Sequence, residues 1–170
     1  MVFVVTVNKM RIKEKNHRLH RELYRGMVDV SFTVCIKDRF PAFTDHTMVE
    51  VFVDILADLA NAAKCTVPAY CFMPDHQHVV LHGLCPESDL WRSIVQYKQK
   101  TGYWMSRYKP GIMWQKDFYD HIIRKDENLL KQVRYVLDNP VRKGLVGSWE
   151  EYPFTGAIGC ELRDVLDGIH

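Results

Sequence analysis

The chain has 170 residues, a hydrophobic share of 47% and a formal net charge of +2. This length and composition indicate a single globular domain over residues 1–170, with a substantial core of its own. No apolar run approaches the roughly 18 residues of a membrane span, which excludes a transmembrane protein.

The N-terminal segment is first apolar and then strongly basic. Its opening, MVFVVTV, has no basic residues ahead of it and makes a poor signal peptide. This stretch could form an edge strand, or translation could begin at Met10. Residues 8–26 then carry seven Lys or Arg side chains against Glu14 and Glu22. We therefore expect residues 1–25 to form a basic arm with a polyanionic partner, and a solvated terminus is the alternative.

The first half of the chain predicts a strand, a long helix and a second strand. Residues 27–36, MVDVSFTVCI, alternate with the period of a strand. Thr44 or Asp45 can then cap a helix whose apolar positions follow the i, i+3, i+4 stripe closely. Residues 67–73, VPAYCFM, are again typical of a strand, and a Pro-Asp turn follows them.

The second half predicts a hairpin partner, a helix, a strand and a last helix. Residues 76–82, HQHVVLH, form a hairpin with the preceding strand. Residues 90–108 are apolar at helical spacing, and residues 112–123, IMWQKDFYDHII, return as a strand. Asp126 starts the last helix, ENLLKQVRYVLDN, and we expect Pro140 to stop it.

The order of these elements predicts the fold class. Strand, helix, strand, strand, helix, strand is the split βαβ, or ferredoxin-like, pattern, in which helices cover an antiparallel sheet. The protein is therefore expected to be α+β, with an added C-terminal helix that carries Tyr135. Residues 156–170 are expected to form a C-terminal tail.

The five cysteines are odd in number and form no C-x-x-C pair. This pattern favours reduced thiols in a cytoplasmic protein over a disulfide framework. A small zinc-stabilised protein is one function class that they leave open, because thiolate and imidazole suit Zn²⁺. Its ligands would be Cys71, His76, His78 and Cys85, whose spacing fits no usual zinc pattern.

His76 and His78 are separated by one residue on a predicted strand. Residues i and i+2 of a strand project from the same face, so both imidazoles point the same way, and His82 shares that face. Histidines grouped in this way suggest a metal site or a charge-handling site. The alternative is that each is a surface histidine or a packed core histidine.

At about 100° per residue, the last helix has one apolar face and one polar face. The apolar side chains are Leu129, Leu130, Val133, Val136 and Leu137, and the polar ones are Asn128, Gln132, Tyr135 and Asn139. Tyr135 and Asn139, spaced i and i+4, present a phenol and a carboxamide together. Two imidazoles and an amide oxygen could hold a divalent cation beside a phenol that attacks a phosphate. The alternative is a half-buried tyrosine followed by a C-terminal cap.

Three segments of the sequence resemble the HUH single-tyrosine transposases, most closely the branch of REP-associated tyrosine transposases. They are the histidine strand YCFMPDHQHVVL, the Trp-Gln strand MWQKDFYDHII and the tyrosine helix VRYVLDNPVRKGLV. They keep the order and spacing of that family. One position departs from the pattern, because the residue between the two histidines is usually hydrophobic in the family and is Gln77 here.

The resemblance implies metal-dependent cleavage and strand transfer of single-stranded DNA, that is, DNA transposition. It implies that Tyr135 is the nucleophile, that the intermediate is a 5′-phosphotyrosine, and that His76, His78 and Asn139 bind Mg²⁺ or Mn²⁺. The substrate would be a hairpin formed by a palindromic repeat, bound by a monomer or a homodimer. A catalytically inactive hairpin-binding module of the same fold is the alternative function.

The predicted helix at residues 90–108 could grip such DNA, because residues 92–109 contain five basic side chains and no acidic one. Lys98 falls inside the apolar stripe, so it either reaches the edge of the helix or contacts the active-site phosphate. Aromatic side chains available for stacking on bases are Tyr97, Tyr103, Trp104 and Tyr108. We expect DNA contacts from Arg92, Lys98, Lys100 and Arg107, together with Arg18 of the basic arm.

Tyr119 is a rival nucleophile, because it lies in DFYDH next to an aspartate and close to His121. A strand tyrosine beside a core-facing Phe118 is more typical of packing, and the resemblance favours Tyr135. His121 and Gln132 could support the site from behind the metal ligands, and His121 could also contact a phosphate.

Overall fold

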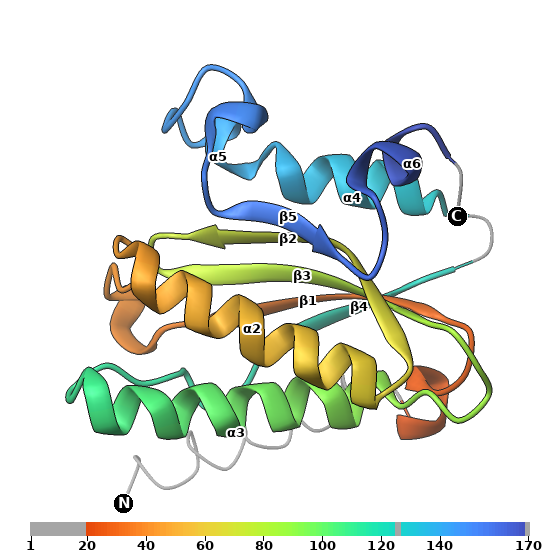
Figure 1. The fold of residues 1–170 in the computed structure, drawn as a ribbon, viewed down its shortest axis with the longest axis horizontal. Coiled ribbons are helices and arrows are strands. Elements are labelled where there is room, and N and C mark those ends of the chain that lie inside the picture. Colours follow the sequence, from red (N-terminus) through yellow and green to blue (C-terminus); the bar gives the residue numbers. More distant parts are fainter. Residues whose placement is uncertain (1–19, 125–126, 169–170) are drawn as a thin grey trace, which may run out of the picture.

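The fold is a five-stranded antiparallel sheet with helices on both faces, shown in Figure 1. The computed structural model describes residues 20–124 and 127–168. The strand order is β4-β1-β3-β2-β5, and its first four strands have the order of a ferredoxin-like split βαβ unit. The predicted α+β, ferredoxin-like fold is therefore confirmed, together with the added helix that carries Tyr135.

The elements have the following bounds. The strands are β1 (Asp29–Cys35), β2 (Cys65–Met73), β3 (His76–Gly83), β4 (Tyr119–Ile123) and β5 (Thr155–Ile158). The α-helices are α2 (His46–Ala62), α3 (Leu90–Tyr108), α4 (Leu129–Leu137), α5 (Asn139–Arg142) and α6 (Leu162–Leu166). Short 3-10 turns are η1 (Arg21–Tyr24), η2 (Lys37–Arg39) and η3 (Trp149–Glu151). No helix in the described ranges is long and apolar enough to cross a membrane.

The two long helices, α2 and α3, lie together on one face of the sheet (Figure 1). Both begin at an aspartate, because the Asp45 side chain accepts a hydrogen bond from the amide of Thr47 and the Asp89 side chain accepts one from the amide of Arg92. Most of the strand residues that face these helices are apolar and fully buried, as Phe32 of β1 illustrates. This side of the sheet holds most of the hydrophobic core.

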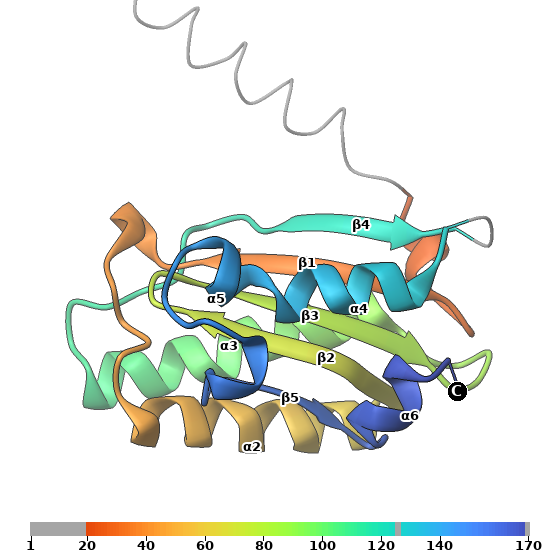
Figure 2. The ribbon, with the colours of Figure 1, turned by 90° about the horizontal axis from the view of Figure 1, so that it is seen from above.

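The opposite face of the sheet is covered by α4, α5 and α6 (Figures 1 and 2). The predicted apolar face of α4 is confirmed, since Leu129, Val133, Val136 and Leu137 are all buried. Figure 2 shows α4 running along the sheet in the same direction as β1, and α5 lying over the end where β3 begins. This arrangement brings the end of the tyrosine helix to the two histidines.

The strand predicted for residues 112–123 is shorter in the structure, where only Tyr119–Ile123 forms β4. Residues 112–118 follow the end of α3 instead, and Trp114 makes an isolated bridge with Ile36. The Lys98 ammonium donates to the backbone carbonyls of Gln115, Lys116 and Asp117 at 2.8, 3.1 and 3.2 Å. These carbonyls are turned toward one lysine, so they do not take part in a strand ladder.

The tyrosine helix α4 ends at Leu137, before Pro140, as predicted. The short helix α5 that follows was not predicted, and Pro140 occupies its first turn, where a missing amide N–H costs nothing. The cap of α4 is Asn128, whose side chain accepts a hydrogen bond from the amide of Leu130. Asp126, the predicted start, lies outside the described residues.

Residues 156–170 are not a simple tail, because β5 adds to the free edge of β2 and α6 packs against α4 and β2. Gly156 permits this pairing, since a Cβ there would lie 2.5 Å from the hydroxyl of Tyr70. At the other end, residues 1–19 lie outside the described residues, and so do Arg18 and the apolar opening. The last part of the basic arm belongs to the core, since Tyr24 is fully buried.

Candidate active site

The two histidines of β3 converge on the sheet face that α4 covers. His76 is 8% exposed, and the Nε2 atoms of His76 and His78 lie 3.1 Å apart. The Nδ1 atom of His76 lies 2.5 Å from the carboxylate of Asp75, and the Nδ1 atom of His78 lies 2.8 Å from the hydroxyl of Thr33. Because each Nδ1 has a partner, each ring is held with its Nε2 toward the other.

This arrangement suits two ligands of one metal ion. Two nitrogens that bind an octahedral ion at about 2.1 Å and at a right angle are about 3.0 Å apart. If Nδ1 of His76 donates to Asp75 and Nδ1 of His78 donates to Thr33, both Nε2 atoms carry free lone pairs. In the described part of the chain, no three His, Cys, Asp or Glu side chains form a metal-binding group, so a third protein ligand would be of another type.

The surroundings keep both imidazoles neutral, which is the form that binds a metal. Burial lowers the pKa of His78 to about 3, and nearby positive charges, including Arg142, act in the same direction. Burial also lowers the pKa of His76, against the opposing effect of its hydrogen bond with Asp75. Neither ring would have to lose a proton at neutral pH before binding a cation.

The other predicted ligand groups do not gather here. His82 lies on the same face, as predicted, but at the far end of β3, where its Nδ1 is 2.7 Å from the carboxylate of Asp29. Cys85 lies beyond the end of β3 and interacts with Ser88. Cys71 neighbours His78 but is buried, which raises the pKa of its thiol to about 12. The proposed four-ligand zinc site is therefore wrong, and all five cysteines are free thiols.

Tyr135 lies on the same sheet face as the two histidines. The side chain of Gln132, three residues earlier on α4, donates to the hydroxyl of Ser31 at 3.0 Å. Three helical residues advance about 4.5 Å and two strand residues about 6.6 Å, so Tyr135 comes near the level of Thr33 on β1. Thr33 is paired with His78. The Tyr135 side chain is half-exposed, and the guanidinium of Arg142 lies 3.8 Å from its ring centroid.

Asn139 is buried at the junction of α4 and α5. Its side-chain nitrogen donates to the carbonyls of Tyr135 at 3.1 Å and Val136 at 3.2 Å, as a C-terminal cap does. These bonds fix which way the amide faces, and its oxygen accepts a hydrogen bond from Arg142 at 2.9 Å. A carboxamide oxygen has a second lone pair, so metal binding by Asn139 is chemically open and stays a prediction.

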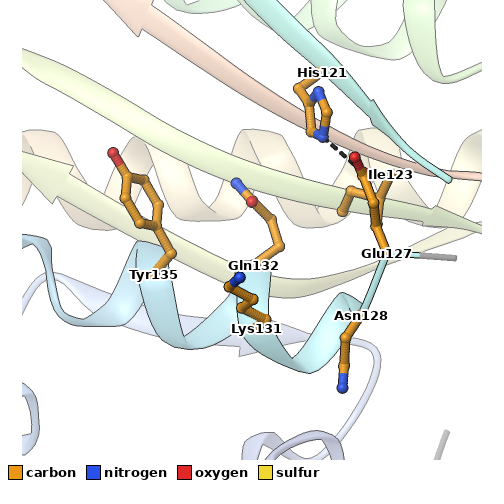
Figure 3. Close-up of a pocket in the computed structure, with 7 residues that line it drawn as sticks. All are labelled: His121, Ile123, Glu127, Asn128, Lys131, Gln132 and Tyr135. Carbon is orange, nitrogen blue, oxygen red and sulfur yellow. Dashed lines mark hydrogen bonds and ion pairs between the residues drawn. The ribbon is translucent and has the colours of Figure 1, made fainter.

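A groove with a volume of about 430 Å³ begins at Tyr135 and runs between β4 and α4 (Figure 3). It is lined by His121, Ile123, Glu127, Asn128, Lys131, Gln132 and Tyr135. The Nε2 atom of His121 lies 2.8 Å from the carboxylate of Glu127, which bridges the two walls. The structure thus brings both supporting residues named from the sequence, His121 and Gln132, into one groove with Tyr135.

Tyr119, the rival nucleophile, is not a packing residue. It is 67% exposed, and it pairs with Thr33, which pairs in turn with His78 on the next strand. Tyr119 therefore belongs to the same sheet face as the histidines, two strands away from His78. That separation is about 10 Å at the usual spacing between strands. Both phenols lie on the face that carries the histidines.

Gln77, the departure from the family pattern, points to the opposite face of the sheet. It is fully buried, and its side-chain oxygen accepts a hydrogen bond of 2.6 Å from the hydroxyl of Tyr97 on α3. Tyr97 is fully buried too, so it is not available to stack on a base as the sequence suggested. Gln77 leaves the alternation of β3 intact, and both histidines keep their orientation.

Helix α3, which carries the predicted DNA-binding residues, lies on the other side of the sheet from α4 (Figure 1). Arg92, Lys100 and Arg107 are exposed, as a phosphate-binding face requires. Lys98 differs, because its ammonium is bound to three backbone carbonyls and the sheet separates it from the histidines. The idea that Lys98 reaches an active-site phosphate is therefore wrong.

Four residues next to the histidines were not identified from the sequence. Thr33 and Asp75 hold the imidazoles, while Arg39 and Arg142 bring positive charge close to them. Asp75 directly precedes His76, so its role could have been noticed. Thr33 could not, because only the pairing of β1 with β3 brings it to His78. Arg39 could not either, because it lies in η2 and approaches His76 through its ion pair with Asp75.

Comparison with known proteins identifies the family of this chain. A sequence model of the IS200-like transposases matches residues 26–139. A Haemophilus influenzae protein, named as a candidate REP-associated tyrosine transposase, is 24% identical over 144 residues, which cover 73% of this chain and 76% of that protein. The REP-associated tyrosine transposase of Escherichia coli K12 is 30% identical over 111 residues, which cover 61% of this chain and 59% of that protein.

Solved structures share the fold. A REP-associated tyrosine transposase bound to a REP hairpin matches with a TM-score of 0.70 and 22% identity, over 91% of this chain and 87% of that one. A candidate transposase of Deinococcus radiodurans matches with a TM-score of 0.50 and 18% identity, over 72% of this chain and 93% of that one. The family match spans more than half of the chain, from β1 through the two histidines to Asn139. This chain belongs to the IS200-like transposase family.

Proposed function

We propose that this protein is a metal-dependent enzyme that cleaves single-stranded DNA and transfers the cut strand, with Tyr135 as its nucleophile. The observation that carries the proposal is the convergence of the His76 and His78 Nε2 atoms, 3.1 Å apart, on the sheet face where the tyrosine helix lies. The family is one of transposases, and DNA transposition requires strands to be cut and rejoined.

Each residue has a defined part in the proposed reaction. Mg²⁺ or Mn²⁺, bound by His76, His78 and Asn139, would polarise the scissile phosphate and offset the charge that develops on it. The oxygen of Tyr135 attacks phosphorus, a phosphotyrosine bond forms, and the bond from phosphorus to the 3′ oxygen breaks. Tyr135 loses its phenol proton and the leaving 3′ oxygen takes up a proton, so there is no net release of protons. One ester replaces another, so the reverse reaction can rejoin strands without a nucleotide cofactor.

The proposed substrate is a single strand next to a DNA hairpin. The relative whose structure was solved with a REP hairpin supports this choice. The groove that begins at Tyr135 would hold the strand, and Lys131 supplies a positive charge at its wall. The exposed basic side chains of α3, Arg92, Lys100 and Arg107, would hold DNA that extends around the other side of the sheet.

The proposal is tested with a single-stranded hairpin labelled at its 3′ end and Mn²⁺, followed by denaturing electrophoresis, because the fragment that carries the 5′ phosphate stays joined to the protein. Wild-type protein should yield a covalent protein–DNA adduct that chelation of the metal prevents. Tyr135→Phe should keep its fold and its hairpin affinity and form no adduct, because only a hydroxyl is lost from a half-exposed ring. Tyr119→Phe is the matched control and should form the adduct at the wild-type rate.

Two results would contradict the proposal. Cleavage by Tyr135→Phe at the wild-type rate would exclude Tyr135 as the nucleophile. Tight binding of the hairpin by wild-type protein, with no adduct at any concentration of Mg²⁺ or Mn²⁺, would instead identify the chain as a hairpin-binding module without turnover.

A further inference from the structure

Arg142 contacts two of the residues to which the proposed function assigns chemistry. Its guanidinium lies 3.8 Å from the centroid of the Tyr135 ring, and its Nη2 atom donates to the amide oxygen of Asn139 at 2.9 Å. Arg142 is the last residue of α5, the short helix that lies over the end of the sheet where β3 begins (Figure 2). It is close enough to His78 for its charge to help lower the pKa of that imidazole.

The charge of Arg142 is not neutralised by its neighbours. Among the described residues, no carboxylate forms an ion pair with it, and the two groups that hold it, an aromatic ring and an amide, are neutral. Arg39, the other arginine near the histidines, differs in this respect, because its Nε atom lies 2.8 Å from the carboxylate of Asp75. A guanidinium has five N–H donors, and the bond to Asn139 leaves Arg142 with donors for an anion.

We propose that Arg142 is a further catalytic residue, which donates hydrogen bonds to the non-bridging oxygens of the scissile phosphodiester. The proposal rests on the proposed function, since Tyr135 must be the nucleophile for this phosphate to lie beside Arg142. The Tyr135 ring and the Asn139 amide hold the guanidinium in place before substrate arrives, so little reorganisation is needed when charge develops on the phosphate. Removing one such preorganised donor typically lowers a rate constant by about 100-fold to 1,000-fold.

The variant that tests this is Arg142→Gln, which removes the charge and keeps an N–H donor for Asn139. Single-turnover cleavage of the labelled hairpin with Mn²⁺ should slow by about 100-fold, while the free energy of unfolding and the hairpin affinity stay close to wild type. Arg142→Lys keeps the charge and should recover part of the rate. Arg134→Gln, on the exposed side of α4, is the matched loss of one positive charge and should cleave like wild type.

A substrate with an uncharged scissile group distinguishes a direct contact between Arg142 and the phosphate from a role of Arg142 in positioning Tyr135. When the scissile phosphate is replaced by a methylphosphonate, it no longer carries the charge that Arg142 would offset. The ratio of wild-type to Arg142→Gln rates should then fall from about 100 toward 1. An unchanged ratio would overturn the phosphate contact.

The proposed function and this inference fail in different ways. Absence of an adduct with the wild-type protein would refute the proposed function itself. Normal adduct formation by wild type, together with an unimpaired Arg142→Gln, would refute only the role of Arg142.

Discussion

The two sides of strand β3 carry different kinds of residue. The residues that face α2 and α3 are Gln77, Val79 and Leu81, and all three are almost completely buried. The residues that face α4 include His76, His78 and His82, each of which has a polar partner. Alternate residues of one strand thus serve different purposes, because one face must exclude water while the other must admit a substrate.

Substitutions on the two faces of β3 should therefore affect different properties, the cleavage rate on one face and the stability of the fold on the other. His78→Ala removes a proposed metal ligand, so we expect cleavage to fall by at least about 100-fold, with little change in the free energy of unfolding. Leu81→Ala on the opposite face should lower the free energy of unfolding by about 2–5 kcal/mol and leave the single-turnover rate of folded protein unchanged. Urea titration and single-turnover cleavage measure the two effects. Cleavage by His78→Ala at the wild-type rate would contradict the role of His78 as a metal ligand.

A smaller effect is expected from the hydroxyl that orients His78. Thr33→Val preserves the shape of the side chain but removes the partner of the His78 Nδ1 atom. Since losing such a partner typically weakens metal binding by about 10-fold to 100-fold, calorimetric titration with Mn²⁺ should show a fall of at least about 10-fold in affinity. Thr33→Ser retains the hydroxyl and should bind like wild type. Equal affinities for all three proteins would show that Thr33 does not position the ring.

On the opposite face, the hydrogen bond between Tyr97 and Gln77 should contribute to stability alone. A double-mutant cycle with Tyr97→Phe and Gln77→Leu should give a coupling energy of about 1 kcal/mol, because each single variant leaves one buried polar group without its partner. Gln77→Leu also introduces the hydrophobic residue type that the family usually has, so its cleavage rate should match wild type. A slower rate in a folded Gln77→Leu protein would mean that the two faces are coupled.

The weakest expected effect concerns His82 and depends on pH. The hydrogen bond with Asp29 raises the pKa of His82 above its unfolded value near 6.5. The stabilisation is therefore fully present below about pH 6.5 and is lost as the pH rises through the folded pKa. The difference in unfolding free energy between wild type and Asp29→Asn should be larger at pH 5.5 than at pH 9, by under about 1 kcal/mol. If this free-energy difference instead increased with pH, the pKa of His82 would not be raised by Asp29.

Periodicity was sufficient to predict much of this molecule. The strand period put His76 and His78 on one face, and the helix period put Tyr135 on the polar side of α4 while its apolar side packs. Both predictions are local, because they need only the geometry of a single element. The order of the elements then defined the sheet, because a split βαβ pattern has few alternatives.

The features that could not be predicted from the sequence depend on contacts between separate elements. Thr33 reaches His78 only through the pairing of β1 with β3, and Arg142 reaches Tyr135 only because the chain forms the short helix α5 after α4 ends. Strand β5 is only four residues long, and its place at the edge of β2 depends on the space that Gly156 leaves for Tyr70. The basic character of residues 92–109 predicts that Lys98 contacts DNA, but its backbone partners, residues 115–117, lie beyond the end of its own helix.

We expect the phenol on α4, rather than the one on β4, to become joined to DNA. Tyr119 and Tyr135 lie on the same sheet face and are both accessible, at 67% and 50% exposure, so accessibility does not decide between them. The most direct measurement is mass spectrometry of proteolytic peptides after incubation of wild-type protein with the single-stranded hairpin and Mn²⁺. We predict a nucleotide attached through its 5′ phosphate to the peptide that contains Tyr135. A nucleotide on the peptide that contains Tyr119 would contradict the account.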